Sequence, residues 1–123
     1  MLKKSASGGY YIEESRKALG LKAFTANGSC AASGYYSFVE GYSTEAAGTG
    51  SHAEGNSTKA SGPYSHAEGQ TTKALGNSSH AEGLNTIASD DFSHAEGSNT
   101  YSNGYSSHSE GNNTKASGYC SHA

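Results

Sequence analysis

Histidine and glutamate recur two positions apart, as H-x-E, at a constant interval along this chain. Copies of S-H-A-E-G or a close variant begin every fourteen residues, at Ser37, Ser51, Ser65, Ser79, Ser93 and Ser107, and a cut-off copy begins at Ser121. Imidazole and carboxylate groups are common acid–base catalysts and metal ligands. An enzyme needs one such pair rather than six, so the regular spacing favours a structural repeat over an active site.

Known catalytic patterns do not fit these residues. Ser51 and His52 are adjacent, and on a strand they face opposite ways, so His52 cannot activate Ser51 as a nucleophile. Zinc deaminases combine H-x-E with P-C-x-x-C, and zincins carry H-E-x-x-H; the sequence contains neither of these partner motifs. We therefore expect no enzymatic activity.

The composition restricts the fold and the partners. Leu, Ile, Val and Phe together supply only eleven of 123 residues, while glycine supplies 17. A conventional bulky core is therefore not expected, but a regular array of small residues can replace it by repetition and backbone pairing. A net charge of −3 leaves no basic field for nucleic acid, and no apolar run is long enough for membrane insertion by this segment.

The repeat unit reads S-H-A-E-G-x-x-T-x-A-x-G-x-x and divides into two five-residue pieces with two short connections. Five residues is a typical strand length, and glycine at two positions per unit disfavours a helix. Because successive residues of a strand face opposite sides, the small Ser, Ala, Thr and Gly residues of both pieces lie on inward faces. The sequence predicts an all-β solenoid of fourteen-residue coils, about 4.8 Å apart, with two short strands per coil.

The cysteines test this arrangement. Cys30 and Cys120 are six coils apart, or roughly 30 Å at the sheet spacing. A disulfide requires Cα atoms within about 7 Å, so we expect no bridge between them within one chain.

The repeat resembles the head repeats of YadA-like trimeric adhesins, whose units read roughly S-x-A-x-G followed by x-x-A-x-G. It is also similar to the SHAEG-type repeats of tail-fibre proteins from bacteriophages of Gram-positive bacteria. The likeness covers residues 37–123 well and residues 16–36 loosely. It implies a left-handed parallel β-roll, three copies of which pack around a threefold axis. We accordingly expect residues 1–15 to form a cap or tail and residues 16–123 to form a homotrimeric roll, strict from residue 37 and truncated at the C-terminus.

One outward face of the predicted roll is constant and the other varies. His and Glu share the side of the first strand opposite its small residues, whereas the matching positions of the second strand change from Lys73 and Leu75 to Ile87 and Ser89. A constant face is typical of an interface, because one wrong side chain would leave a buried partner unpaired. We expect the trimer axis to be lined by His52, Glu54, His66, Glu68, His80, Glu82, His94, Glu96, His108 and Glu110; a solvent-exposed His/Glu face is the alternative. The adhesin family commonly has apolar residues there, so this axis would be polar and wet.

Metal binding is a second interpretation of the same residues. Three copies of His66, His80 or His94 around a threefold axis could supply three imidazoles to Zn²⁺ or Ni²⁺. The simpler interpretation is that each ring of side chains is a hydrogen-bonded structural layer. We expect no other cofactor.

Aromatic residues near the connections could contact a ligand. Tyr64, Phe92, Tyr105 and Tyr119 could stack against sugars, or could instead shield sheet edges and pack between chains. We expect a non-enzymatic attachment segment of a trimeric fibre, on a phage virion tail or an extracellular bacterial surface, with a cell-surface glycan or receptor as partner. The alternative function is a carbohydrate- or metal-binding module whose repeats contact the ligand directly.

Overall fold

The computed structural model describes residues 2–4, 10–12, 17–18, 24–25 and 29–123. The S-H-A-E-G piece forms the long strand of each coil, as β6 (Phe38–Tyr42), β8 (His52–Asn56), β10 (His66–Gln70), β12 (His80–Leu84), β14 (His94–Ser98) and β16 (His108–Ser109). The second piece forms the short strands β5 (Ala31–Ala32), β7 (Glu45–Ala46), β9 (Lys59–Ala60), β11 (Lys73–Ala74), β13 (Ile87–Ala88), β15 (Tyr101–Ser102) and β17 (Lys115–Ala116). Towards the N-terminus lie β1 (Leu2–Lys4), β2 (Tyr10–Ile12), β3 (Lys17–Ala18) and β4 (Phe24–Thr25).

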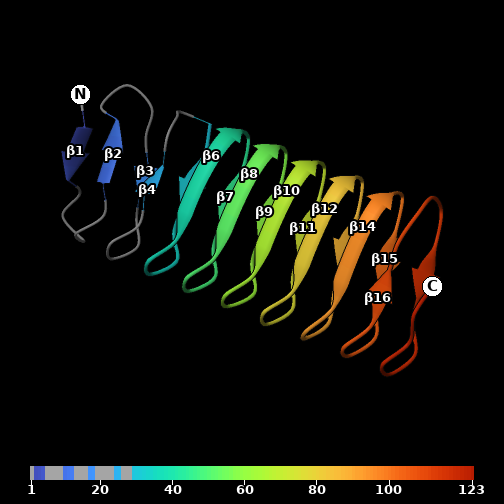
Figure 1. Ribbon diagram of the computed structural model, residues 1–123. Coiled ribbons are helices and arrows are strands. Elements are labelled where there is room, and N and C mark those ends of the chain that lie inside the picture. The colour runs from blue at the N-terminus through green and yellow to red at the C-terminus, as the bar shows by residue number, and fades with distance from the viewer. Residues whose placement is uncertain (1, 5–9, 13–16, 19–23, 26–28) are drawn as a thin grey trace.

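These strands form two sheets along a single stack of coils (Figure 1). The even-numbered strands, with β1 at the edge, form one sheet, and the remaining odd-numbered strands form the other. Neighbouring coils pair in parallel without a register shift, as in His66↔His80 and Lys73↔Ile87, and the described antiparallel pair is β1 with β2. The predicted all-β parallel solenoid, with about six turns of fourteen residues and two strands per turn, is confirmed. Its hand and its trimeric state stay predictions.

The N-terminal boundary of the roll lies outside the described residues. Strand β2 pairs in parallel with β4 at the same fourteen-residue spacing, Tyr10↔Phe24. The predicted change from a terminal segment to the roll falls at residues 15 and 16, which the structure does not describe.

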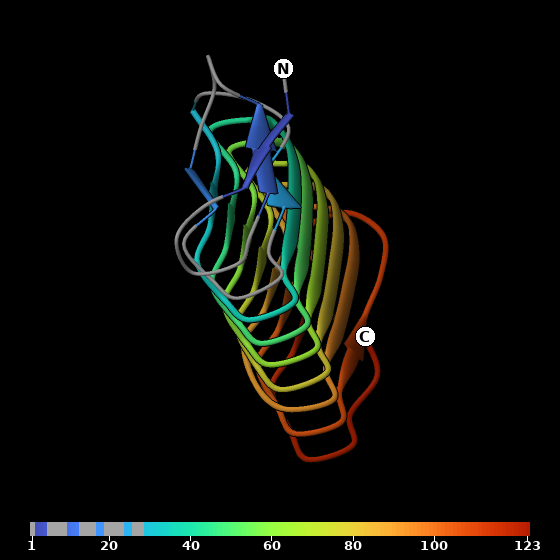
Figure 2. The ribbon, with the colours of Figure 1, turned by 90° about the vertical axis from the view of Figure 1, so that its left-hand side faces the viewer.

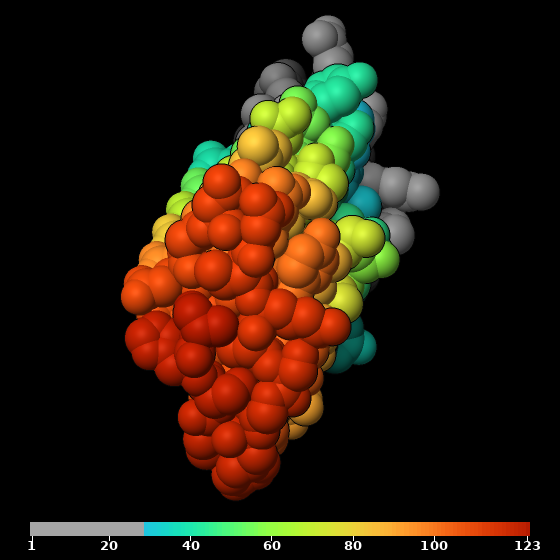
Figure 3. Space-filling model, turned by 90° about the vertical axis from the view of Figure 1, so that its right-hand side faces the viewer, coloured from blue at the N-terminus to red at the C-terminus, as the bar shows by residue number. Residues whose placement is uncertain are grey.

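The interior between the two sheets is narrow. Viewed along the stack, the coils follow one another as flattened loops (Figure 2), and Figure 3 shows them offset one behind the next from the C-terminal end. Ala53 and Ala60 are fully buried, as are their equivalents in neighbouring coils, and Val39 is the bulkiest fully buried side chain among the residues whose burial is described. One alanine methyl stabilises the fold by only about 0.8 kcal/mol. The roll therefore depends on many equivalent small contacts.

The constant serine of S-H-A-E-G closes one corner of each coil. Ser51 Oγ is buried and donates a hydrogen bond to the carbonyl of Gly48 at 2.6 Å, and Ser65 Oγ does the same to Gly62 at 2.7 Å. The opposite corner uses Ser57, whose φ is +59° and whose amide bonds the Tyr42 carbonyl of the preceding coil at 2.8 Å. One corner is thus hydrogen-bonded within its own coil and the other to the preceding coil.

The glycine of S-H-A-E-G behaves differently from the simple alternation expected for it. Gly55 is exposed and has φ of +108°, and a Cβ atom placed there would lie 2.1 Å from the Gly69 carbonyl oxygen. Both the backbone conformation and the close approach of the next coil require glycine.

No disulfide joins Cys30 and Cys120, as the repeat spacing predicts. Cys30 is buried at the position where later coils have threonine, and Thr44 Oγ1 lies 2.9 Å from its sulfur. Cys120 is exposed at a corner.

The histidine–glutamate face as a candidate functional site

The long strands place every described histidine of the repeat on one face. In β10, Ala67 points into the interior and is fully buried, while His66 and Glu68 on either side of it point outward. About a third of each of these two side chains is exposed. Because the strands are paired without a register shift, each histidine lies directly beside the histidine of the next coil.

The imidazole rings form a continuous stack. Ring centroids from His52 to His122 are 4.7–4.9 Å apart and the ring planes are within 7° of parallel. At the N-terminal end of this stack, Phe38 meets His52 edge-on, with centroids 5.0 Å apart. The stacking distance equals the strand spacing, so the backbone ladder positions the rings.

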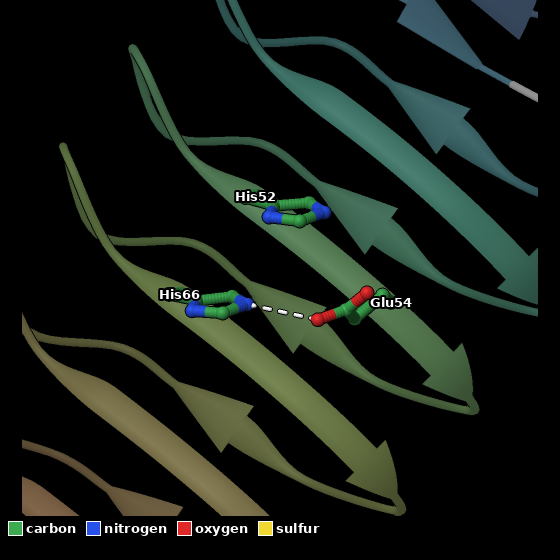
Figure 4. A group of neighbouring side chains, drawn as sticks. All are labelled: His52, Glu54 and His66. Atoms are coloured by element: carbon green, nitrogen blue, oxygen red, sulfur yellow. Dashed lines mark hydrogen bonds and ion pairs between the residues drawn. The ribbon is translucent and has the colours of Figure 1, made fainter.

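Each histidine contacts the glutamate of the preceding coil. Nε2 of His66 lies 3.3 Å from Oε1 of Glu54 (Figure 4), and His108 lies 3.2 Å from Glu96. The equivalent distances are 3.4 Å for His80 with Glu68, 3.5 Å for His94 with Glu82, 3.4 Å for His122 with Glu110 and 3.8 Å for His52 with Glu40. We call the histidines and glutamates of the H-x-E pairs from His52 to Glu110, together with His122, the His/Glu face. This face is therefore a ladder of contacts within one chain.

These contacts determine the arrangement of protons. An ionised carboxylate only accepts hydrogen bonds, so a neutral histidine bonded through Nε2 carries its proton there and leaves Nδ1 as an acceptor. In His52 and His94, Nε2 is shielded from solvent and has no hydrogen-bond partner.

The crowding of the face perturbs two acid–base groups. Burial, followed by the charge of His66, lowers the pKa of His80 below its ordinary value of 6.5, despite the opposing effect of Glu82 and Glu96. Burial raises the pKa of Glu82, but its hydrogen bonds with the Glu96 and Glu68 carboxyl groups and the nearby His80 outweigh burial. The pKa of Glu82 therefore lies below its ordinary value of 4.5. Folding thus disfavours protonation of both groups.

The residues predicted for the trimer axis all lie on this one face, and whether the face meets other chains stays a prediction. The single chain also brings together potential metal ligands that the sequence analysis did not combine. Ligand atoms of His52, Glu54 and His66 lie within 4.8 Å of one another, and the next four coil pairs repeat this group. The relevant signal in the sequence is the two-residue offset within a fourteen-residue period, which brings Glu54 next to His66 of the following coil.

The predicted aromatic residues are exposed but do not form one surface. Phe92 and Tyr105 are in edge-on contact at 5.4 Å, and Tyr105 stacks on Tyr119 at 5.0 Å. Tyr64 is 66% exposed and lies over Gly50 of the preceding coil, where an added Cβ would be 2.9 Å from its ring. The aromatic cluster is therefore Phe92, Tyr105 and Tyr119.

The fold and the His/Glu face define a parallel β-solenoid protein with one chemically constant face. No pocket is present among the described residues, and none of them belongs to a helix long and apolar enough to cross a membrane. No family model matches the chain, and no match was found among curated proteins.

Proposed function

We propose that this chain is a non-enzymatic, structural segment of a homotrimeric fibre that holds a receptor-binding element away from its base. The fibre would belong to a phage tail or a bacterial surface adhesin, and would therefore be located on a virion tail or an extracellular cell surface. The resemblance of the repeats to those of trimeric adhesins and tail fibres supports this assignment.

The observation that carries the proposal is the difference between the two outward faces. His and Glu occupy the same positions in successive coils of one sheet. On the other sheet, matching positions hold Glu45, Lys59, Lys73, Ile87, Tyr101 and Lys115. Solvent tolerates such variation, whereas an interface between copies demands constancy because each buried polar group needs its partner.

The packing of the single roll supports association. Alanine, serine and threonine fill most of the interior beside Val39, and the larger Leu75 and Leu84 are exposed. Repeat arrays gain stability from neighbouring surfaces, and small domains with little apolar burial frequently need oligomerisation. Packing the His/Glu faces of three copies together, with side chains that are each about one-third exposed in the single chain, would shield the His–Glu contacts from water and strengthen them.

Light scattering on the full chain tests the oligomeric state. The expected mass is three times the 12.6 kDa of one chain, at concentrations where circular dichroism shows β structure. A folded monomer over that concentration range would contradict the proposal.

A second candidate function is carbohydrate binding at the aromatic cluster. Phe92, Tyr105 and Tyr119 expose 50%, 37% and 76% of their areas and contact one another along one corner of the roll. Aromatic faces of this kind can stack on sugar rings. Binding of the isolated chain to a glycan array, abolished by Tyr119→Ala and retained by Tyr64→Ala, would support this candidate; no binding would leave the cluster as a packing contact.

A further inference from the structure

We propose that the His/Glu face binds divalent transition-metal ions of the Zn²⁺ and Ni²⁺ class, one ion for every second coil. The three sites are His52–Glu54–His66, His80–Glu82–His94 and His108–Glu110–His122. All ligands of each site come from one chain, so the inference does not rest on the trimeric fibre.

The geometry of one site already approaches that of a metal centre. In a tetrahedral zinc site with ligands at about 2.0–2.1 Å, neighbouring ligand atoms are about 3.3 Å apart. The Glu54 Oε1 to His66 Nε2 distance is 3.3 Å, and all three ligand atoms of the group lie within 4.8 Å. Closing the remaining gap requires His52 and His66 to tilt towards each other, and both side chains are about one-third exposed, which leaves them room to move.

Two nitrogen atoms of the face have only long carboxylate contacts, at 3.8 Å for His52 Nε2 with Glu40 and 3.5 Å for His94 Nε2 with Glu82. Nε2 of His52 and Nε2 of His94 are shielded from solvent without a hydrogen bond. Each belongs to a different proposed site and is directed along the same row of carboxylates. A metal ion between His52 and His66, or between His80 and His94, would satisfy these nitrogens.

The repeat itself limits how many ions can bind. Five His–Glu–His groups exist between His52 and His122, but each inner histidine belongs to two of them. One Nε2 can ligate one ion in this arrangement, so only non-overlapping groups can be filled together. The largest non-overlapping set contains three groups, and only one choice of groups reaches that number. Alternate filling also separates the ions by about 9.6 Å rather than 4.8 Å, which halves their Coulomb repulsion.

The donor set selects the class of ion. Two imidazole nitrogens and one carboxylate oxygen suit Zn²⁺, Ni²⁺ and Cu²⁺, whereas Ca²⁺ and Mg²⁺ require oxygen ligands. Three protein ligands leave a coordination position for water or for a group of another chain. Binding replaces the Nε2 proton, so the ions compete with protons for the same nitrogens.

Native mass spectrometry of the full chain titrated with Zn²⁺ tests the proposal, because it counts ions and chains together. We expect saturation at three Zn²⁺ per chain and no comparable uptake of Mg²⁺. Saturation at six per chain would show that the six single Glu–His pairs bind independently and would overturn the shared sites, and absence of uptake at micromolar Zn²⁺ would overturn them altogether.

Two chemically identical substitutions in adjacent coils test the alternation. Glu82→Gln removes a ligand of the central site and should lower the count from three to two. Glu68 belongs only to the group His66–Glu68–His80, which is not among the three proposed sites. Glu68→Gln should therefore leave the number of bound ions at three. Equal losses in the two variants would overturn alternate filling. Unchanged β-sheet circular dichroism in both variants ensures that the comparison concerns folded protein.

The same spectra separate this proposal from the trimeric fibre. A monomer that binds three ions would support the metal sites and contradict the trimer. A trimer that binds no ions would support the trimer and contradict the metal sites. If each ion were held by three equivalent histidines from three chains, the six histidines of each chain would give two ions per chain. A trimer with two ions per chain, a count unchanged by Glu82→Gln, would therefore overturn the sites within one chain.

Discussion

Oε1 of Glu54 lies 3.3 Å from Nε2 of His66, twelve residues further along the chain and one coil further along the solenoid. The interval follows from the repeat, because histidine precedes glutamate by two residues in a unit of fourteen. The same contact recurs in the following coils, from Glu68–His80 to Glu110–His122. Each long strand is thus tied to the next through side chains as well as through the backbone.

Substitution on the constant face should destabilise the protein more than substitution on the variable face. We expect His80→Ala with Glu82→Ala to lower the stability of the protein by more than 1 kcal/mol, because contacts in three coils are lost. The matched control, Lys73→Ala with Leu75→Ala on the exposed side of the other sheet, should change it by about 0.5 kcal/mol or less. Thermal unfolding at fixed protein concentration measures both. Equal losses would place the His/Glu face on the solvent side.

The stability of the roll should decrease in acid. The pKa values of His80 and Glu82 lie below their ordinary values of 6.5 and 4.5, so the folded chain binds protons less readily than the unfolded chain. The contribution of His80 is present above pH 6.5 and is lost as the pH falls below it. The contribution of Glu82 is present above pH 4.5 and is lost as the pH falls through its lower folded-state pKa.

Urea unfolding between pH 8 and pH 3, in the presence of a chelator to remove metal competition, measures this dependence. His66, Glu68, His94 and Glu96 face the same two groups. The variant His80→Gln should weaken the dependence near pH 6.5 and, to a smaller extent, that below pH 4.5, because His80 helps to lower the pKa of Glu82. Stability that increases on acidification would contradict the assigned directions.

A larger side chain in the interior should destabilise the protein. Ala81 is fully buried between the sheets, and Ala81→Leu should destabilise the protein by at least about 1–3 kcal/mol, because overpacking forces the sheets apart. Gln70→Leu is the matched control: Gln70 is exposed, and the paired position of the next coil already holds Leu84. Denaturant unfolding compares the two variants. Similar stabilities would mean that the interior is wider than the structure indicates.

The glycine of S-H-A-E-G should be required mainly because the next coil lies too close to allow a side chain there. A Cβ at Gly69 would lie 2.1 Å from the Gly83 carbonyl oxygen, with φ of +109°. Gly111 has a similar φ of +103°, but an added Cβ there would have its nearest neighbour at 3.7 Å. Gly111→Ala should therefore cost only the backbone strain, about 1–3 kcal/mol. Gly69→Ala should cost more because it also separates two coils, and equal unfolding temperatures for the two variants would count against this explanation.

Several features of the protein follow from the sequence alone. A period of fourteen without insertion requires equivalent residues to stack in register, which yields a parallel solenoid and aligns His66 with His52 and His80. Small residues at alternate positions indicate a narrow interior, and Ala67 and Thr72 lie in it as predicted. Both features depend on side-chain size and periodicity, which are local properties of the sequence.

Other features were decided by the tertiary structure. The second strand of each coil is only two residues long, as in Lys59–Ala60, because the chain bends at its corners. Gly55 is exposed rather than inward, since the close approach of Gly69 and a positive φ interrupt the alternation. The stack of imidazoles, the Glu54–His66 contact and the aromatic cluster depend on the strand spacing and on the reach of each side chain across it. Periodicity aligns residues in successive coils, but only the three-dimensional structure determines which atoms of neighbouring coils come within bonding distance.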